Sequence, residues 1–176
     1  MEEGPLRLVR EFVNTRDIEG GTEALGDPDE LAKWLRHNDL LGAGDPVTEA
    51  DLDRAVELRE AVRDLLAGAP DERAADVLST AARRSRVRPR FSAAGTVTLT
   101  PTAPGVDGSL GTLLTLIAEA MTDGRWRRLK VCHNHGCRWA FFDTSRAGAG
   151  KWCTMAICGN RNKAAAWRAR QRSPRR

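Results

Sequence analysis

The spacing of hydrophobic residues predicts that most of the chain up to residue 124 is helical. Apolar side chains recur at i, i+3 and i+4, which is the period of one helix face, in five separate stretches. These stretches predict helices over about residues 6–15, 28–41, 48–67, 71–84 and 110–122. The last is the most apolar, so we expect it at the centre of the core, with a stripe formed by Leu110, Leu113, Leu114, Ile117, Ala118 and Met121.

Polar residues mark the starts of two of these helices, and glycines mark the breaks between helices. Asp27 precedes Pro28, and Thr48 precedes the third stripe, so each is expected to cap a helix N-terminus. Residues 16–26 and 105–108 contain several glycines and are expected to be loops. Around residues 90–101 the period changes to two, which predicts a small β-hairpin. The predicted fold class is therefore mainly α.

All four cysteines of the chain lie near its C-terminus, in two C-x4-C pairs with fifteen residues between them. Two such knuckles can wrap four thiolates around one tetrahedral zinc ion, and a site closed by four thiolates is structural. His133 and His135 lie inside the first pair, so either could replace a cysteine, lie exposed, or donate a hydrogen bond to sulfur. The predicted ligands of a single structural Zn²⁺ are Cys132, Cys137, Cys153 and Cys158.

The second cysteine pair runs directly into a basic helical pattern. Gly159 permits a tight exit from the knuckle, and Asn160 is expected to cap a helix over residues 161–172. Such a helix fits the major groove of DNA, where Arg can read guanine and Gln can read adenine. Arg161 has a second interpretation, in which it braces the knuckle by donating to backbone carbonyls. The predicted nucleic-acid contacts are Arg161, Lys163, Arg168, Arg170, Gln171 and Arg172, with Arg146 and Lys151 on the loop between the pairs.

The aromatic residues around the cysteines are expected to form a small core of their own. Trp167 is expected to fold back onto this segment, and stacking of one exposed aromatic on a nucleic-acid base is the alternative. Asp143 is the single acid after residue 124 and is expected to orient an arginine, or to cap the next turn with Ser145. The residues of this predicted core are Trp139, Phe141, Phe142 and Trp152.

The charge of the chain is divided unevenly between its two parts. Residues 125–176 contain 14 Lys and Arg and one acid, a net charge of +13, whereas residues 1–124 contain 14 Lys and Arg and 23 acids, a net charge of −9. A cationic segment joined to an anionic one favours a nucleic-acid partner. A solvated basic tail, or a tail folded back on the acidic part, also fits. Residues 83–90 form a second basic run, either a solvated linker or a second phosphate-contacting patch.

The sequence Trp152-Cys153-Thr154-Met155, followed by Cys158-Gly159-Asn160-Arg161 and Lys163, is the most specific pattern of the chain, together with Phe142-Asp143 and Ser145. This pattern resembles the CGNR zinc-finger family of bacterial transcription regulators. Members of that family carry an N-terminal, mostly helical domain called ABATE, described as a stress-induced regulator domain, which residues 12–15 and 58–61 resemble. The resemblance implies zinc binding and DNA binding.

These observations together predict two domains: an ABATE-like helical domain with a small hairpin over residues 1–124, and a four-cysteine zinc finger ending in a basic helix over residues 125–176. We expect a zinc-dependent bacterial transcription regulator that binds duplex DNA. An RNA-binding zinc module and a zinc-stabilised protein-interaction module remain the alternatives. A small-molecule effector of the N-terminal domain and a homodimer are left open.

Several other classes of protein are disfavoured. No nucleophile lies beside a base in the sequence and no glycine-rich phosphate loop is present, so we do not expect an enzyme. The acidic N-terminus lacks the apolar run of a signal peptide, and residues 110–121 are too short and too polar to span a membrane. Clustered cysteines favour metal over disulfides in a reducing compartment. We therefore expect a cytoplasmic, nucleoid-associated protein with no membrane partner.

Overall fold

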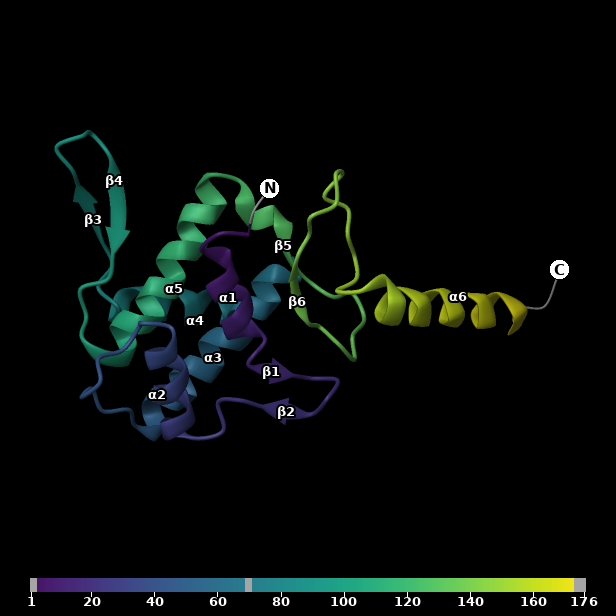
Figure 1. Cartoon of the computed structure of the whole chain (residues 1–176), viewed down its shortest axis with the longest axis horizontal. Coiled ribbons are helices and arrows are strands. Elements are labelled where there is room, and N and C mark those ends of the chain that lie inside the picture. Colours follow the sequence, from purple (N-terminus) through teal and green to yellow (C-terminus); the bar gives the residue numbers. More distant parts are fainter. Residues whose placement is uncertain (1–2, 69–70, 173–176) are drawn as a thin grey trace.

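A computed structural model describes residues 3–68 and 71–172, without the side chains of Ala166, Ala169, Arg170 and Arg172. The described residues form six α-helices and three two-stranded antiparallel hairpins (Figure 1). The helices are α1 Leu6–Val13, α2 Pro28–His37, α3 Glu49–Leu66, α4 Glu72–Arg84, α5 Gly105–Thr122 and α6 Asn160–Arg172. The strands are β1 Arg16–Asp17, β2 Thr22–Glu23, β3 Arg88–Phe91, β4 Val97–Thr100, β5 Leu129–Val131 and β6 Ala140–Phe142. The predicted mainly helical fold class is confirmed.

The predicted helix starts are confirmed by the cap geometry. The Asp27 carboxylate accepts a hydrogen bond from the N–H of Glu30 at 2.8 Å, and Pro28 occupies the first turn of α2. Thr48 forms a reciprocal capping box with Asp51 at the start of α3. These side chains satisfy backbone N–H groups that have no partner within the helix, which is why polar residues mark the boundaries so clearly.

The main hydrophobic core lies between α1, α2, α3 and α5. Its fully buried members include Phe12 of α1, Leu35 of α2, Leu58 of α3 and Leu113 of α5. Leu129, Val131 and Ala140 of the β5–β6 hairpin belong to the same core, although they lie after the predicted domain boundary at residue 124. The first strands of the cysteine-rich segment therefore pack as part of the helical core.

Residues 105–108 were expected to be a loop, and that expectation is wrong, because α5 begins at Gly105. The glycines here permit close packing instead of a turn. A Cβ at Gly108 would lie 2.2 Å from the carbonyl oxygen of Ala103, and a Cβ at Gly111 would lie 2.4 Å from the Cβ of Ser85. Absent side chains thus allow α5 to approach the preceding segments, which the spacing of glycines in the sequence does not reveal.

The two hairpins of the N-terminal part differ in how well the sequence predicted them. Residues 16–26 were expected to be a loop but contain the short β1–β2 pair, in which Arg16 lies opposite Glu23. The hairpin expected around residues 90–101 is present as β3 and β4, with four paired positions from Arg88–Thr100 to Phe91–Val97. It projects from the body beside α4 and α5 (Figure 1).

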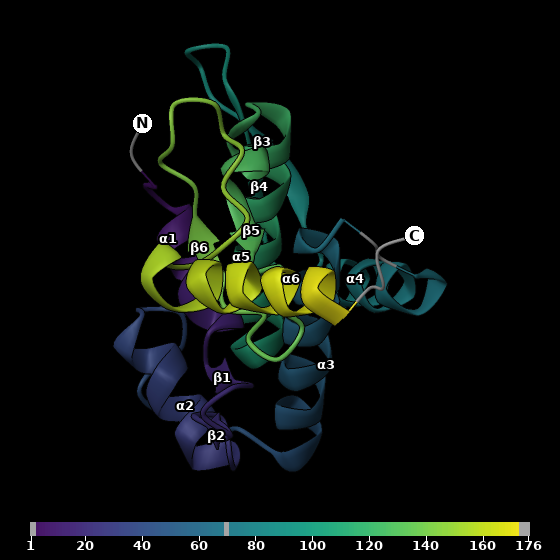
Figure 2. The ribbon, with the colours of Figure 1, turned by 90° about the vertical axis from the view of Figure 1, so that its right-hand side faces the viewer.

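Helix α6 extends away from the rest of the molecule, at the end of the molecule's longest axis opposite to the β3–β4 hairpin (Figures 1 and 2). All of its described side chains are exposed, including Trp167, which is 57% exposed. The expectation that Trp167 folds back onto the finger is therefore wrong. Among residues 3–68 and 71–172, no helix has both the length and the apolarity needed to cross a membrane.

Candidate zinc centre and nucleic-acid interface

The four cysteine sulfur atoms lie together, all within 4.8 Å of one another. The Sγ of Cys153 lies 3.8 Å from that of Cys137 and 3.7 Å from that of Cys158. Four thiolates about 2.3 Å from a central zinc ion would be separated by about 3.8 Å along each edge of the tetrahedron. A disulfide would need about 2.0 Å, and all four cysteines are free. The cluster therefore has the donor chemistry and the spacing of a single zinc site.

The first cysteine pair lies at the turn of the β5–β6 hairpin. Cys132 follows β5, and its N–H donates to the carbonyl of Trp139 at 2.9 Å, which extends the strand pairing by one position. The N–H groups of Cys137 and Arg138 both donate to the carbonyl of Asn134, at 2.8 and 3.0 Å. The hairpin and its tight turn thus hold both sulfurs of this pair at a fixed separation.

The second pair lies at the start of the C-terminal helix. The Thr154 hydroxyl accepts from the N–H of Ile157 and begins a π-helical turn, Met155–Gly159, that carries Cys158 and continues into α6. The expected cap at Asn160 is therefore wrong, since its side chain donates to the Ala156 carbonyl inside the helix at 3.1 Å. Gly159 does not make a turn, but leaves room for the Met155 side chain. One sulfur of the cluster is thus rigidly attached to α6.

The pKa values of the cysteine thiols indicate that a bound cation is needed to hold all four as thiolates. Burial raises the pKa of Cys137, and burial likewise raises the pKa of Cys153 to about 11. Burial also opposes ionisation of Cys132, but backbone hydrogen bonds from Cys153 and Asn134 outweigh it and lower its pKa. The side-chain amide of Asn134 donates to the Cys158 sulfur at 3.8 Å. Four thiolates cannot ionise together here without a positive charge, which a divalent metal would supply.

The two histidines lie outside the sulfur cluster. His133 and His135 are exposed, and the group of close metal-binding side chains consists of the four cysteines alone within the part of the chain that the structure describes. His133 contacts the edge of Trp152, with the ring centroids 6.0 Å apart. The hydrogen bond to sulfur that was considered for a histidine is made instead by Asn134.

The predicted aromatic core of the finger is confirmed only in part. Trp139 and Trp152 pack against the cysteine cluster. Phe142 packs against the main helical core, because β6 lies beside α1. Two of the four aromatic residues therefore support the metal site, and Phe142 supports the attachment of the finger to the helices.

Asp143 organises the loop between the cysteine pairs. Its carboxylate accepts from Lys130 Nζ at 2.7 Å, from the N–H of Ser145 at 3.0 Å and from the N–H of Gly150 at 2.8 Å. Burial alone would raise the pKa of Asp143, but these hydrogen bonds outweigh it and hold the pKa well below its usual range. The expected cap at Ser145 is confirmed, whereas the cation that Asp143 orients is a lysine.

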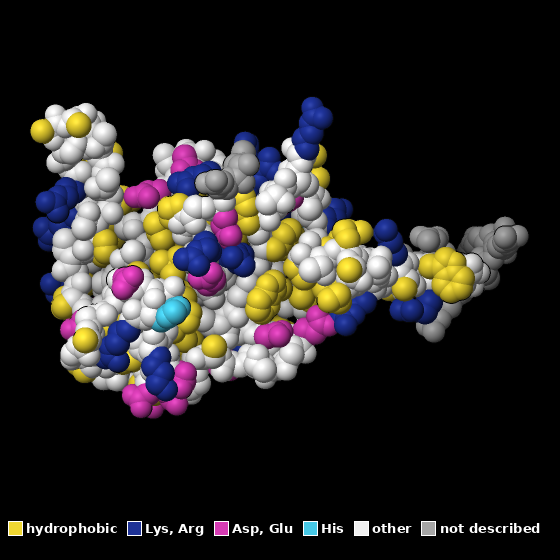
Figure 3. Space-filling view, viewed as in Figure 1, with side chains coloured by type: hydrophobic (Ala, Val, Ile, Leu, Met, Phe, Trp, Pro, Cys, Tyr) yellow, Lys and Arg dark blue, Asp and Glu magenta, His cyan; other side chains and the backbone are white. Residues whose placement is uncertain are grey.

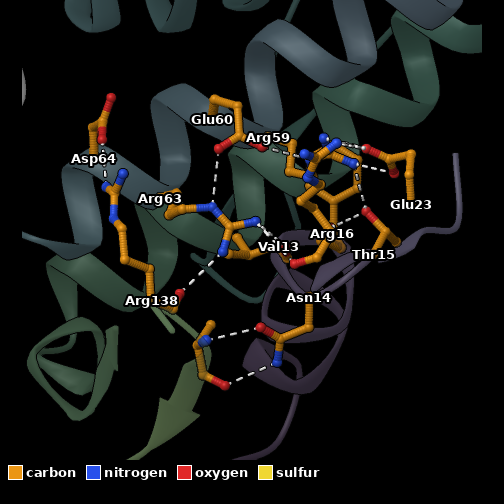
Figure 4. A network of polar contacts seen from close by, with 12 residues as sticks. Val13, Asn14, Thr15, Arg16, Glu23, Arg59, Glu60, Arg63, Asp64 and Arg138 are labelled. Carbon is orange, nitrogen blue, oxygen red and sulfur yellow. Dashed lines mark hydrogen bonds and ion pairs between the residues drawn. The ribbon is translucent and has the colours of Figure 1, made fainter. Parts of the chain in front are cut away.

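A network of polar contacts, centred on buried Arg63, joins the finger to the helical part (Figure 4). Arg63 of α3 is fully buried, and it donates to the carbonyl of Val13 at 2.6 Å, to the carbonyl of Arg138 at 3.0 Å and to the carboxylate of Glu60 at 3.0 Å. Burial lowers the pKa of Arg63, although the Glu60 charge offsets part of this effect. One guanidinium thus connects α1, α3 and the first knuckle.

Two further contacts complete this network, which we call the joint and define as Asn14, Glu60, Arg63, Asp64, Arg138 and Ala140. The Asn14 side chain pairs with the backbone of Ala140 in both directions, at 2.9 and 2.8 Å. Arg138 donates to Asp64 at 2.6 Å. Beside the joint, Arg59 binds both oxygens of Glu23, at 2.7 and 2.8 Å. The helices and the finger are therefore held together by directional bonds as well as by the shared core.

The residues of the joint were not predicted as functional, although the sequence contains a signal for Arg63 and for Arg59 beside the joint. Residues 12–15 and 58–61, which carry the N-terminal resemblance, both lie at or beside the joint. Arg59 and Arg63 occupy apolar-stripe positions of α3, where Arg59 directly follows buried Leu58 and Arg63 directly follows buried Val62. A charged residue on a buried helix face must find polar partners, so this position alone indicates a structural network.

Two adjoining clefts beside the finger form a basic surface. The first, of about 670 Å³, lies next to the first knuckle, and the second, of about 590 Å³, lies between that knuckle and α6. His133 and His135 line both clefts, and none of the described residues that line either one is acidic. We call these two clefts the basic face. Its cationic side chains are Arg127, Lys130, Arg138, Lys151, Arg161 and Arg168.

The structure brings some of the predicted nucleic-acid contacts to the basic face and leaves others apart. Lys151, Arg161 and Arg168 line it, whereas Arg146 is exposed on the inter-knuckle loop and lines neither cleft. Lys163 and Gln171 are exposed on α6. The side chains of Arg170 and Arg172, and residues 173–176, lie outside the described part of the chain. Arg127 and Arg138 line the basic face and were not predicted.

The opposite side of the finger is acidic. A cleft of about 910 Å³ between the finger and the helical part is lined by three acids, Glu3, Asp17 and Glu19, and one cation, Arg10, with Phe141 and Ile157 among its apolar residues. Arg161 forms an ion pair with Glu19 from this side. The expected bonding of Arg161 to backbone carbonyls is replaced by this side-chain contact. A polyanion would therefore be repelled from this cleft and attracted to the basic face.

Comparison with known protein families agrees with this geometry. A family model named ABATE, described as "Putative stress-induced transcription regulator", matches residues 6–124, more than half of the chain. The chain belongs to the ABATE family. A second model, the CGNR zinc finger, matches residues 128–171, so the resemblance drawn from the sequence is confirmed. No curated protein matches the chain.

These families make the chain a zinc-finger member of a family of regulators. The ABATE match covers α1 to α5, and the CGNR match covers the four cysteines, most of α6 and every cationic residue of the basic face except Arg127. The predicted single zinc is supported by the finger family together with the clustered sulfurs. Neither of the two is a family of enzymes.

Proposed function

We propose that this protein is a zinc-dependent transcription regulator that binds duplex DNA through α6 and the basic face. In this proposal Cys132, Cys137, Cys153 and Cys158 hold one zinc ion, and the helical domain over residues 1–124 and the finger over residues 125–176 act as two parts of one molecule. The observation that carries the proposal is the attachment of an exposed basic helix directly to a cysteine of the metal cluster, Cys158.

The exposed α6 has the dimensions and side chains of a groove-binding helix. Its 13 residues contain no acid and span about 20 Å at 1.5 Å per residue. An α-helix fits the major groove, where Arg168 and Gln171 would be near base edges, while Lys151 and Arg161 would contact phosphates. Arg161 would exchange the Glu19 carboxylate for a phosphate, which the greater charge of DNA favours.

The lack of packing around α6 also supports a partner for it. Isolated helices of this length are only marginally stable in water, because most helical stability in proteins comes from packing of an apolar face. The described side chains of α6 bury no such face. Phosphate contacts along its basic side would supply the stabilisation that the protein itself does not.

Two variants test the proposal by separating metal binding from DNA binding. Cys158→Ser is expected to lose both the zinc ion and duplex binding, because Cys158 anchors α6 to the cluster. Arg168→Ala is expected to retain one zinc per chain and to bind DNA more weakly, by about 1–3 kcal/mol, because it loses a contact at the base edges. Zinc content and fluorescence anisotropy of a labelled duplex measure these effects.

The matched control is Lys33→Ala, which removes an exposed cation from α2, outside the basic face. It should leave both affinity and salt slope unchanged. The proposal would be contradicted if Cys158→Ser bound duplex DNA as the unmodified chain does. If Cys158→Ser kept a tightly bound zinc, the ligand set would be wrong and a histidine would be implicated.

A small-molecule effector is a second proposal, supported by a pocket within the helical part. The pocket has a volume of about 510 Å³ and lies between α3, α4 and α5. Arg54, which lines the pocket, has a buried Nε that makes no hydrogen bond among the described residues and is held only by an ion pair with Asp107, at 3.2 Å. The lining contains more charged residues than an internal apolar pocket would have. Its charged members are Arg54, Arg73, Arg84, Glu57, Glu72, Asp76 and Asp107.

A mixed lining of this kind suits a small compound with both an anionic and a cationic group. We expect such compounds to raise the melting temperature of the protein, and Arg54→Gln to reduce the shift. Thermal denaturation with a panel of amino acids and other zwitterionic metabolites tests this expectation. If none of them raises the melting temperature, the pocket is not the site of an effector of that class.

A further inference from the structure

A second basic surface lies at the end of the molecule far from α6. We call it the arm and define it as residues 83–100, the last two residues of α4 and the β3–β4 hairpin. The arm contains five arginines and no acid, whereas the rest of residues 1–124 contains nine Lys and Arg and 23 acids, a net charge of −14. The arm is therefore a cationic projection on a strongly acidic body. Its arginines are Arg83, Arg84, Arg86, Arg88 and Arg90.

The strand register divides the arm into two faces. Arg88 lies opposite Thr100, and Arg90 lies opposite Thr98, so these residues share one polar face of the two-stranded ribbon. The alternate pairs, Pro89–Leu99 and Phe91–Val97, share the other face. The arginine side of the ribbon is therefore continuous and distinct from its apolar side.

The arginines of the arm are available to a partner. Arg88 and Arg90 are exposed, as is Arg86 at the base of the ribbon. Within the described residues, none of these three forms an ion pair. Three unpaired guanidinium groups on one projection attract a polyanion, because their charges are not neutralised within the protein.

The arm is anchored to the helices, which distinguishes it from a solvated linker. Buried Ser85 accepts at its carbonyl from the N–H groups of Thr102 and Ala103, at 3.1 and 3.2 Å, and thereby closes the base of the hairpin. Gly111 of α5 lies directly against Ser85. The ribbon consequently keeps a defined direction with respect to α4 and α5. A two-stranded ribbon fits the major groove of DNA as well as an α-helix does.

The arm and α6 lie at opposite ends of the longest axis of the molecule (Figures 1 and 3). In Figure 3, Lys and Arg side chains gather along the hairpin on the left below its tip, and most of the acidic side chains lie over the body between the two ends, with some Lys and Arg among them. A straight duplex that contacts α6 would have to pass along this acidic body to reach the arm. Like-charge repulsion disfavours that path, so the two basic ends suit separate duplex segments.

We propose that the arm is a second DNA-binding surface and that the protein bridges two duplex segments, one held by α6 and the basic face and the other by the arm. This proposal rests on the proposed function, since it takes DNA as the ligand of α6. Non-specific contacts to phosphates by Arg86, Arg88 and Arg90 would be sufficient for the arm, because bridging requires no reading of sequence.

A bridging assay tests the proposal with the full zinc-loaded chain. One biotinylated duplex is held on beads, and a second, fluorescent duplex is recovered only if the protein binds both. We expect recovery with the unmodified chain. We expect the variant Arg88→Thr/Arg90→Thr to bind a single duplex with a salt slope lower by no more than about two, but to lose recovery of the second. Threonine suits a strand and matches the opposite residues, so the ribbon should persist, which an unchanged melting temperature would verify.

A matched variant, with substitutions on the apolar side of the ribbon, distinguishes bridging by a single chain from bridging by a dimer. Phe91→Thr/Leu99→Thr changes the side of the ribbon that carries exposed Phe91, 78% accessible, and should still bridge. Light scattering gives the number of chains in each sample. Loss of bridging in this variant together with dissociation of a dimer would overturn the proposal in favour of pairing between copies.

Other outcomes also decide the question. Persistent bridging by Arg88→Thr/Arg90→Thr would overturn the role of the arm. Binding of one duplex without any bridging would overturn the second surface and leave the proposed function intact. Absence of binding to any duplex by the zinc-loaded chain would contradict both proposals together.

Discussion

A buried arginine of α3, Arg63, determines how the helical part meets the finger. Arg63 has no exposed surface, and its hydrogen-bond partners come from three separated segments, at Val13, Glu60 and Arg138. Burying a guanidinium is unfavourable unless its donors are satisfied. The carbonyl partners are directional, so this contact fixes the orientation of the first knuckle and not merely its distance from α3.

Replacing Arg63 with Met should therefore destabilise the whole molecule. The substitution keeps an unbranched side chain but leaves two backbone carbonyls and one oxygen of Glu60 without their donor, so we expect a loss of about 3–5 kcal/mol. Urea denaturation at fixed zinc concentration measures it. The control Lys33→Met changes an exposed position and should cost less than about 0.5 kcal/mol. Equal effects of the two substitutions would show that the joint contributes no stability.

The neighbouring pair of Arg59 and Glu23 gives a prediction for pH. Burial would raise the pKa of Glu23, but the hydrogen bonds from Arg59 and from the N–H of Leu25 outweigh it and lower the pKa. A carboxylate with a lowered pKa contributes stability that is complete above its unfolded pKa, about 4.3 for Glu, and is lost as pH falls through the folded value. Glu23→Gln should accordingly be less stable than the unmodified chain at neutral pH, and the difference should shrink below about pH 4. Chemical denaturation at several pH values measures this difference, and a gap that widened on acidification would contradict it.

The contrast between the cysteines and the arginines shows which residues the sequence can predict. The cysteine cluster depends on two short spacings and on the chemistry of thiolates, so Cys132 and Cys158 were found from the sequence alone. The partners of Arg63 are 50 and 75 positions away for Val13 and Arg138, and no local pattern names them. Asn160 was misplaced because Thr154, six positions earlier, begins the helical turn instead.

At the scale of elements, α5 shows that glycine in a sequence can indicate either a loop or close packing between elements. Gly105 and Gly108 were interpreted as a loop, yet they form the first turn of the most apolar helix. The helix is possible because Gly108 and Gly111 leave space for the Ala103 carbonyl and for Ser85. Helix propensity disfavours glycine by about 1 kcal/mol, and close packing between elements overrides that preference here.

A substitution at Gly111 tests this interpretation. Alanine would raise helix propensity, but its Cβ would lie 2.4 Å from the Ser85 Cβ and 2.8 Å from the Pro101 Cβ, which are not the ends of flexible side chains. We expect Gly111→Ala to lower stability by about 1–3 kcal/mol through overpacking. The control Gly44→Ala adds a methyl group where nothing lies within 4 Å and should be nearly neutral. A more stable Gly111→Ala protein in thermal denaturation would refute the packing argument.

At the scale of the whole molecule, the finger and the helices share one core. The charge asymmetry and the CGNR pattern predicted a division near residue 124, but no local pattern indicates that Leu129, Val131 and Ala140 pack with α1 and α3. Those contacts arise because β5 packs against α3 and β6 packs against α1, which lies more than a hundred residues earlier in the chain. Consequently, only the β5–β6 hairpin separates the metal site from the main core.

Removal of zinc should therefore affect residues well outside the finger. Zinc-finger peptides gain about 10–16 kcal/mol from their metal, and losing it should loosen the turn that positions Arg138 and Ala140. We expect a chelator to lower the melting temperature and to increase amide hydrogen exchange at residues 12–16 and 59–66. Readdition of zinc should reverse both effects. Unchanged exchange in these segments after zinc loss would show that the joint is independent of the metal.

The distribution of charge over the molecule supports the proposed zinc-dependent binding of duplex DNA. The most direct test compares binding of the zinc-loaded chain to duplex DNA, single-stranded RNA and double-stranded RNA of equal length across a salt series. With six to eight contacts from Lys and Arg, we predict preference for duplex DNA and a log–log slope of about −5 to −7. A clear preference for either RNA would contradict the DNA assignment. Absence of binding to all three would make the finger a structural or protein-contact module.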